Sequence, residues 1–300
     1  MVILIDEAFI AEPGWLAFLD DVNAHLREGD RVLCVSLTRR ALEIDSPILE
    51  TNFIRLHDVP EDVRGIVFLN RVTHALCRLV AGSEQPLRVF LSHAKADGLE
   101  IAERIRRYLQ SGTGIDDFFD AQDITEGAKW ASVIRGAASE NLLLAIRTDA
   151  YAAREWCRTE VLHAKMGGSP LVVLDALETM EPRGFPYLGN APSVRWHGDD
   201  SAETMENLLC IVLREALRFR HFPRRVSDLC RAYRIPDGER VLAVPPELLT
   251  VLRARSTSDN GATLRIIYPD PPLGTDELAL VTELVPDLET RTPTALIARR

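Results

Sequence analysis

A carboxylate on the apolar side of a predicted helix is the first sign of chemistry in this sequence. Residues 154–161 read Arg-Glu-Trp-Cys-Arg-Thr-Glu-Val. Because each residue of a helix turns about 100° from the last, Glu160 would share a face with small or apolar residues: Ala153, Trp156, Cys157 and Ala164. A carboxylate against apolar walls is costly unless it is paired, protonated or used in a reaction. Its position alone leaves open an ion pair with an arginine such as Arg147, or a functional site.

The segment around Glu160 alternates between short apolar runs and helical runs. The expected strands are residues 87–92, 115–120, 141–148, 170–177 and 193–196, and the expected helices are 97–110, 128–140, 151–166 and 201–219. The strands are apolar and rich in β-branched residues, which suits a parallel sheet that is buried on both faces. Five strands with intervening helices predict an α/β fold, with a flavodoxin-like, doubly wound five-stranded parallel sheet.

Ligands of such a sheet bind beyond the carboxyl ends of its strands. Three stretches leave the predicted strands at that edge: residues 92–97, 120–130 and 147–157. Glu160 lies two turns into the helix that follows the third of these strands. We therefore expect its carboxylate at the rim of a cleft, backed by Trp156 and Cys157.

Two further α/β segments flank this middle part, so that we predict three domains: 1–86, 87–221 and 222–300. The first has expected strands at 2–5, 31–37 and 52–57 and helices at 15–28 and 63–80, and its role is unknown. The last has expected strands at 240–244, 262–268 and 294–300 and a helix at 275–285, and is a candidate for regulation or assembly.

The composition is typical of soluble globular proteins and makes several classes of partner unexpected. Of 300 residues, 46% are hydrophobic and 27% charged, and the net charge is −10. An acidic chain repels nucleic acid and anionic lipid, so neither is an expected partner. Five scattered cysteines without Cys-x-x-Cys spacing argue against a disulfide framework or a zinc site. No apolar run is long enough to span a membrane and the N-terminus has no basic region, so a cytoplasmic location is expected.

Four stretches within residues 88–176 together resemble a TIR (Toll and interleukin receptor) domain of the bacterial type. They are RVFLSHAKAD as the first box, FFDAQDITEGAKW as the second strand and its BB loop, LLLAIRTDAYAAREWCRTEVLHAK as the third strand and its helix, and PLVVLDAL as the fourth strand. The tyrosine followed by Trp-Cys-x-x-Glu is the most specific part. The resemblance covers about the middle 130 residues and neither flank.

The resemblance implies a flavodoxin-like fold and, as in enzymatic family members, cleavage of NAD+ between nicotinamide and ribose. Glu160 matches the catalytic glutamate of these enzymes. The chemistry suits one carboxylate, because nicotinamide leaves as a neutral molecule and a fixed anion stabilises the oxocarbenium charge on the ribose. NAD+ would be the substrate, and neither a metal nor a cofactor is expected.

The resemblance also implies a set of substrate-binding positions: Phe90, Ser92, His93, Trp130, Trp156 and Cys157. Each has a structural alternative. Trp130 could stack on a flat base or anchor the next helix, and a strand residue such as Phe90 is more often core. His93 would otherwise be a turn residue. Cys157 is expected to pack, since no histidine stands at the spacing of a base.

Three classes of function follow. The first is a TIR-family NAD+ glycohydrolase of a bacterial antiviral response, which self-associates through TIR domains and is held off by the flanking segments until an activating ligand binds. The second is a TIR interaction module without catalysis. The third is an enzyme that acts on another nucleoside or nucleotide. The BB loop lacks the Arg-Asp and Pro-Gly elements of animal adaptors, which weakens an adaptor function. The sequence does not decide between a linear and a cyclic ADP-ribose product.

Overall fold

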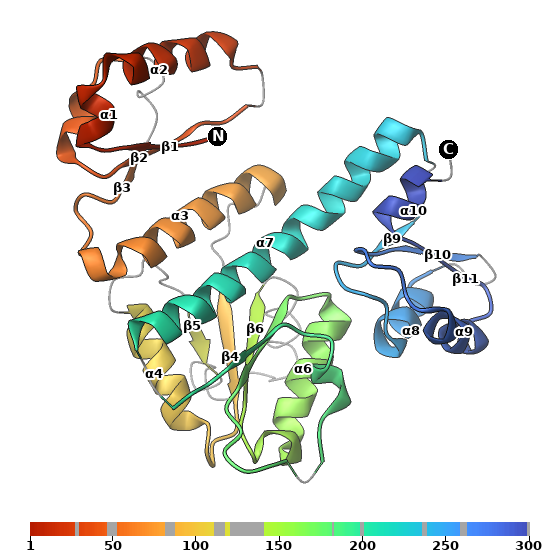
Figure 1. Ribbon diagram of the computed structural model, residues 1–300. Coiled ribbons are helices and arrows are strands. Elements are labelled where there is room, and N and C mark those ends of the chain that lie inside the picture. Colours follow the sequence, from red (N-terminus) through yellow and green to blue (C-terminus); the bar gives the residue numbers. More distant parts are fainter. Residues whose placement is uncertain are drawn as a thin grey trace. The chain divides into compact units, whose positions relative to one another are not determined.

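The computed structural model describes most of the chain, in ten ranges: residues 1–27, 30–46, 53–81, 88–110, 118–120, 141–181, 183–198, 201–235, 239–258 and 263–298. The chain divides into two compact units (Figure 1). The first contains Met1–Ala75 with Leu109–Ile115, and the second contains Leu76–Tyr108 with Asp116–Arg300. The boundary near residue 75 falls inside the long helix α3 (Glu61–Ala81).

The first unit is a small parallel sheet with helices packed on it. Its strands β1 (Val2–Ile5), β2 (Leu33–Ser36) and β3 (Ile54–Arg55) pair in that order. Its helices are α1 (Glu7–Ala11), α2 (Pro13–His25) and the 3-10 helix η1 (Arg39–Glu43). The Asp6 carboxylate accepts a hydrogen bond from the backbone N–H of Phe9 at 2.8 Å and so caps α1. Ile3, Ile5, Phe9 and Leu19 are among the buried residues of its core.

The central sheet of the second unit has the strand order β5-β4-β6-β7-β8, and all neighbouring strands are parallel. The strands are β4 (Val89–His93), β5 (Phe118–Asp120), β6 (Leu142–Arg147), β7 (Leu171–Asp175) and β8 (Ser193–Arg195). The helices are α4 (Leu99–Gln110), α6 (Glu155–Gly167) and α7 (Ala202–Tyr233), with the 3-10 helices η4 (Tyr151–Ala153) and η5 (Pro186–Leu188). The helix predicted at 128–140 lies outside the described residues.

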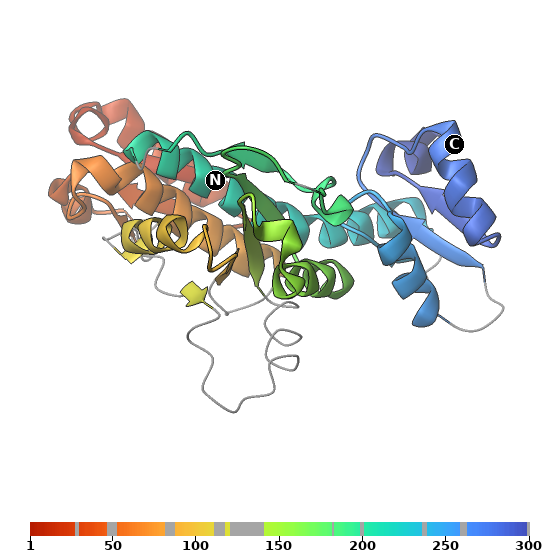
Figure 2. The same cartoon turned by 90° about the horizontal axis from the view of Figure 1, so that it is seen from below.

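Both faces of this sheet are buried, as the apolar strand runs predicted. One set of alternating residues, with Phe90, Leu143 and Val173, packs in one core with residues of α6. Figure 2 shows this helix, in green, beside the strands. The residues between them, such as Leu91 and Leu144, point to the opposite face and are equally buried. The α/β class and the parallel sheets are confirmed, and they fit a flavodoxin-like fold.

A third parallel sheet, in the order β11-β10-β9, forms the C-terminal part of the second unit. Its strands are β9 (Arg240–Val241), β10 (Leu264–Ile267) and β11 (Leu288–Arg291), and its helices are α8 (Leu248–Ser256), α9 (Thr275–Leu284) and α10 (Pro293–Ala298). The helix α7 continues through residue 221, where we placed the end of the middle domain, and ends at Tyr233.

The last strand was predicted in the wrong place. Residues 293–298 are helical, and the strand is Leu288–Arg291. The physical reason is local: the Thr292 hydroxyl accepts a hydrogen bond from the N–H of Ala295 at 3.4 Å, and Pro293 takes the first helical position. A threonine cap followed by proline starts a helix.

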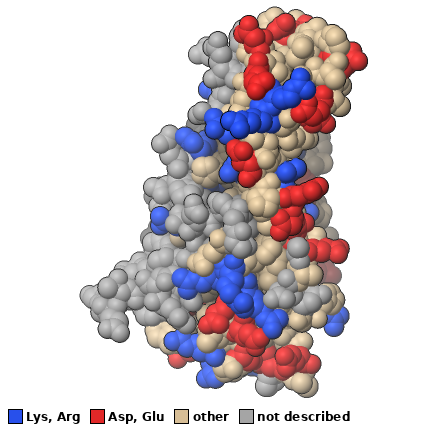
Figure 3. Space-filling model, turned by 90° about the vertical axis from the view of Figure 1, so that its left-hand side faces the viewer, with Lys and Arg blue, Asp and Glu red and all other residues tan. Residues whose placement is uncertain are grey.

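Two general features bear on partners. Within the described ranges, no helix combines the length and the apolar character needed to cross a bilayer. On the face shown in Figure 3, the basic side chains are interspersed with acidic ones and do not form one continuous field.

Candidate functional site

Glu160 lies on the buried face of α6, as the helical period predicted. The buried residues of this helix are Cys157, Glu160, Val161 and Ala164, and Glu160 itself is 5% exposed. The helix ends at Gly167, and Gly168 follows with φ of 71°, a left-handed conformation that glycine adopts without strain. The carboxylate is therefore inside the protein, on a helix with a well-defined end.

A chain of buried hydroxyl groups reaches the Glu160 carboxylate from the neighbouring elements. The Ser92 hydroxyl, near the carboxyl end of β4, donates to Glu160 Oε2 at 2.5 Å. The Ser92 and Tyr151 hydroxyl oxygens are 2.6 Å apart. Because a serine hydroxyl has one hydrogen, Tyr151 is the donor to Ser92. Ser92 is 1% exposed and Tyr151 is fully buried. Burial raises the pKa of Tyr151 well above its usual value, so its hydroxyl stays protonated as this arrangement requires.

Cys157 is a packing residue in the described structure. Its side chain lies in the core that α6 shares with the sheet and is 3% exposed. Burial, and after it the negative charge of Glu160, raises the pKa of the Cys157 thiol to about 12. A nucleophilic cysteine must be a thiolate near neutral pH, so this thiol is not suited to attack.

Arg147, which we named as a possible ion-pair partner of Glu160, is bound to other acids. Its guanidinium lies 2.5 Å from Glu181 and 3.9 Å from Asp175. The hydrogen bond to Glu181 raises the pKa of Arg147 above its already high usual value. The strand register places Arg147 beside Asp175 at the ends of β6 and β7. These ion pairs connect the ends of β6 and β7 to Glu181, and Arg147 is not the ion-pair partner of Glu160 that we had considered.

The loops at the carboxyl edge are tied together by aspartates that our sequence reasoning did not assign to the site. Asp97 accepts hydrogen bonds from the Thr148 hydroxyl at 2.7 Å and the Ala150 N–H at 2.8 Å. Asp149 accepts from the Thr179 hydroxyl at 2.5 Å, and this hydrogen bond holds the pKa of Asp149 below its usual value. The exits of β4, β6 and β7 are thus held in one arrangement. The sequence feature that could have predicted these hydrogen bonds is the presence of short polar residues in the loops that follow the strands.

The other predicted positions do not all gather around the carboxylate. Phe90 is 6% exposed and belongs to the sheet core. His93 ends β4, and within the described ranges its two ring nitrogens are buried and make no hydrogen bond. Trp156 is 60% exposed, whereas its neighbour Cys157 is buried, and the expectation that Trp156 walls the carboxylate stays a prediction. It stands in the first turn of α6. Trp130 lies outside the described residues, together with most of the loop from 120 to 130.

A second constellation, in the first unit, has residue types that can do nucleophilic chemistry. The Ser36 hydroxyl is 2.8 Å from Nδ1 of His57, and Nε2 of His57 is 3.2 Å from the Asp58 carboxylate. Ser36 is completely buried. A nucleophile must reach its substrate, so this arrangement links the ends of β2 and β3 and is not a candidate active site. No cluster of three or more possible metal ligands occurs in the part of the chain that the structure describes.

Comparison with known proteins identifies the segment that holds this site. A family model described as TIR domain matches residues 89–209. No curated protein matches the chain. The matched segment starts in β4, contains Ser92, Tyr151 and Glu160, and ends within α7. It supports a TIR domain in the middle of the chain, as the motifs predicted, and a function of the kind that TIR domains have, either NAD cleavage or signalling through association.

Proposed function

We propose that this protein is a TIR-family NAD+ glycohydrolase that cleaves the bond between nicotinamide and ribose. The observation that carries the proposal is the Glu160 carboxylate, which is buried at a TIR-type parallel sheet and held at 2.5 Å by the Ser92 hydroxyl. The position of this glutamate in the Trp-Cys-x-x-Glu motif, inside the matched segment, supports the same reading.

The chemistry requires little more than a well-placed anion. As the bond between C1′ and nitrogen breaks, its electron pair goes to the pyridinium nitrogen, and nicotinamide leaves as a neutral molecule. Positive charge develops on the ribose, and the Glu160 carboxylate stabilises it electrostatically. Ser92, itself held by Tyr151, fixes the carboxylate before the substrate arrives, which avoids reorganisation during the reaction. Water then adds at C1′ and releases a proton to the solvent, which gives ADP-ribose, or a nucleophilic group of the same molecule adds to give a cyclic product.

The test is chromatography of NAD+ incubated with concentrated protein, with wild type beside Glu160→Gln. Glutamine keeps the shape of the side chain and can still accept from Ser92, but it has no charge. We expect Glu160→Gln to lose nicotinamide release by a factor of at least about 10². Glu155→Gln is the matched control, because Glu155 is an exposed glutamate of the same helix. Equal turnover by the two variants would refute the assignment of Glu160.

The second candidate is a TIR interaction module without catalysis. It is favoured by the burial of Glu160, because a carboxylate that is 5% exposed and engaged by Ser92 also fits a structural role. This function predicts no loss of NAD+ at any protein concentration, together with self-association that survives Glu160→Gln. The loss of NAD+ in the chromatography separates the two candidates, and sedimentation of both proteins tests the self-association that the two share. Self-association through TIR domains and a role in bacterial antiviral defence belong to the proposal in both cases.

A further inference from the structure

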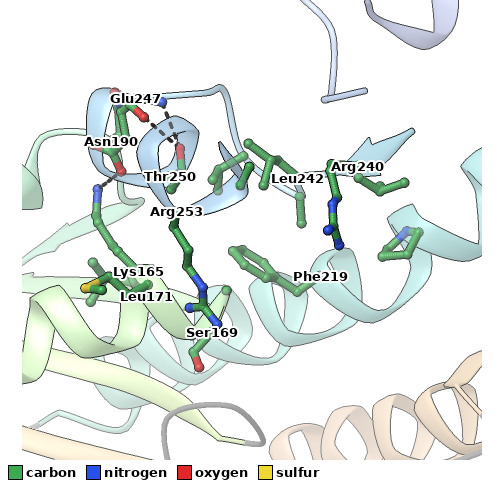
Figure 4. Close-up of a pocket in the computed structure, with 18 of the residues that line it drawn as sticks. Lys165, Ser169, Leu171, Asn190, Phe219, Arg240, Leu242, Glu247, Thr250 and Arg253 are labelled. Carbon is green, nitrogen blue, oxygen red and sulfur yellow. Dashed lines mark hydrogen bonds and ion pairs between the residues drawn. The ribbon is translucent and has the colours of Figure 1, made fainter. Parts of the chain in front are cut away.

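A cavity of about 270 Å³ lies at the opposite edge of the central sheet from Glu160. It opens beside Leu171, the first residue of β7, whereas Ser92 is near the carboxyl end of β4. The residues that line it come from the end of α6, from α7, from β9 and from α8 (Figure 4). It is therefore separate from the site described above.

The charges around this cavity are unevenly paired. Lys165 donates to Glu247 at 2.5 Å, and Arg218 donates to Glu215 at 2.6 and 2.8 Å, so these lining acids are neutralised. Two lining arginines remain. Within the described ranges, neither Arg240 nor Arg253 contacts an acid. The cavity thus has an excess of positive charge, although the whole chain has a net charge of −10.

The two arginines differ in how their side chains are used. Arg240 donates to the Thr257 carbonyl at 2.5 Å, which fixes its direction. The Arg253 guanidinium makes no hydrogen bond or ion pair with the described residues and reaches from α8 toward Ser169 (Figure 4). A guanidinium presents five donors in a planar fork that matches a carboxylate or a phosphate. Arg253 has these donors available.

An aromatic ring stands between the two guanidinium groups. In Figure 4, Phe219 lies between Arg253 and Arg240. The Arg218 guanidinium lies 5.0 Å from the centre of the Phe219 ring. The lining also contains Pro223, one turn further along α7, and Leu242. Flat apolar surface next to free guanidinium donors suits a ligand that is itself a flat ring with an anionic group.

We infer that this cavity is a binding site for a small planar organic anion, in which the ring packs against Phe219 and a phosphate or carboxylate group binds Arg253, with Arg240 beside it. The cavity is near the lower end of the usual range for ligand sites, so the ligand is small. The inference does not depend on the proposed activity, because none of its residues touches Glu160.

Isothermal titration calorimetry on the full chain tests the inference with four probes. AMP and benzoate are planar anions with a phosphate and a carboxylate, respectively. Adenosine has the ring without the charge, and inorganic phosphate has the charge without a ring. We expect AMP or benzoate to bind to one site per chain. Its affinity should exceed that of adenosine, which lacks the charge, and that of inorganic phosphate, which lacks the ring. The stronger of the two identifies the anionic group.

Variants connect the binding to this cavity. Arg253→Ala should raise the Kd by roughly ten- to a hundredfold, as expected for the loss of charge-assisted hydrogen bonds. Phe219→Leu should also weaken the binding of both planar anions. Arg225→Ala, an exposed arginine of α7 away from the cavity, is the matched control and should bind like wild type.

Four results would overturn the inference. They are the absence of binding by both planar anions at millimolar concentration, equal affinity in Arg253→Ala and Arg225→Ala, binding of AMP that is no tighter than that of inorganic phosphate when both bind, and binding that is lost in Glu160→Gln but kept in Arg253→Ala. The last result would assign the ligand to the region of Glu160. The calorimetry needs no turnover of NAD+, so its failure and the failure of the proposed function are distinguishable.

Discussion

Removal of the Ser92 hydroxyl is the most direct perturbation of the buried chain that ends on Glu160. Ser92→Ala takes away the donor to Glu160 Oε2 and the acceptor of the Tyr151 hydroxyl at the same time. Both groups are buried, so water cannot replace the lost partner. A hydrogen bond to a charged group contributes about 1.5–3 kcal/mol, and an unpaired buried hydroxyl costs about 1–3 kcal/mol. We expect the variant to lose about 2.5–6 kcal/mol of stability.

A double-mutant cycle separates this chain from general damage to the core. Tyr151→Phe removes only the donor to Ser92 and should cost about 1 kcal/mol. In the double variant with Ser92→Ala, no tyrosine hydroxyl is left unpaired. The double variant should therefore be more stable than the sum of the single losses predicts, by about 1 kcal/mol.

The assay must follow the central sheet itself, because a chain with two compact units does not have one unfolding transition. Hydrogen exchange of amides in β4 and α6, measured in low urea, reports the opening of this part. Ser193→Ala, an exposed serine at the start of the edge strand β8, is the matched control and should be close to wild type. Additive losses in the cycle, or a Ser92→Ala variant as protected as Ser193→Ala, would refute the reasoning.

Two further perturbations test the surroundings of the carboxylate. Because the folded pKa of Cys157 is about 12 and its ordinary value is 9.0, its contribution to stability is fully present below pH 9 and is lost as the pH rises from about 9 through 12. Cys157→Ala should therefore show a shallower loss over this range in urea titrations, and equal slopes would contradict the assignment. Asp97→Ala removes the hydrogen bonds to Thr148 and Ala150 and should cost about 1–3 kcal/mol. Faster hydrogen exchange at the Ala150 amide is the measurement, and unchanged exchange there would show that Asp97 does not hold this loop.

The burial of Glu160 could be predicted from the sequence because it depends on helical period alone. Residues three and four apart share a face, so Cys157, Glu160 and Ala164 lie on one side wherever the helix packs. Trp156 shows the limit of the same reasoning. The period places it near that face, but Trp156 is 60% exposed while Cys157, the next residue, is buried. Period predicts the direction of a side chain and not what lies opposite it.

The partners of Glu160 could not be predicted in the same way. Ser92 and Tyr151 are 59 residues apart, and Ser92 and Glu160 are 68 apart. Their meeting depends on β4 pairing with β6 in a fixed register, with Ser92 beside Ala145. The resemblance to TIR domains supplied Ser92 as a site position, but not the hydrogen bond. The C-terminal part had no such aid, and its last strand was therefore assigned to a run of apolar residues that forms α10.

The kind of partner that holds Glu160 bears on which function the carboxylate can have. An ion pair with an arginine would stabilise a buried carboxylate, but it would also cancel much of the field that a developing sugar cation needs. Ser92 is a neutral donor to the carboxylate, and Arg147 is paired with Glu181 and Asp175. The Ser92 hydroxyl, which is held by Tyr151, donates to the carboxylate, and this is the direction of hydrogen bond that a carboxylate anion accepts. Catalysis by a fixed anion needs the charge of Glu160, whereas a structural role can be filled by its shape and its hydrogen bond to Ser92. Charge removal by Glu160→Gln, with shape preserved, therefore separates the two functions.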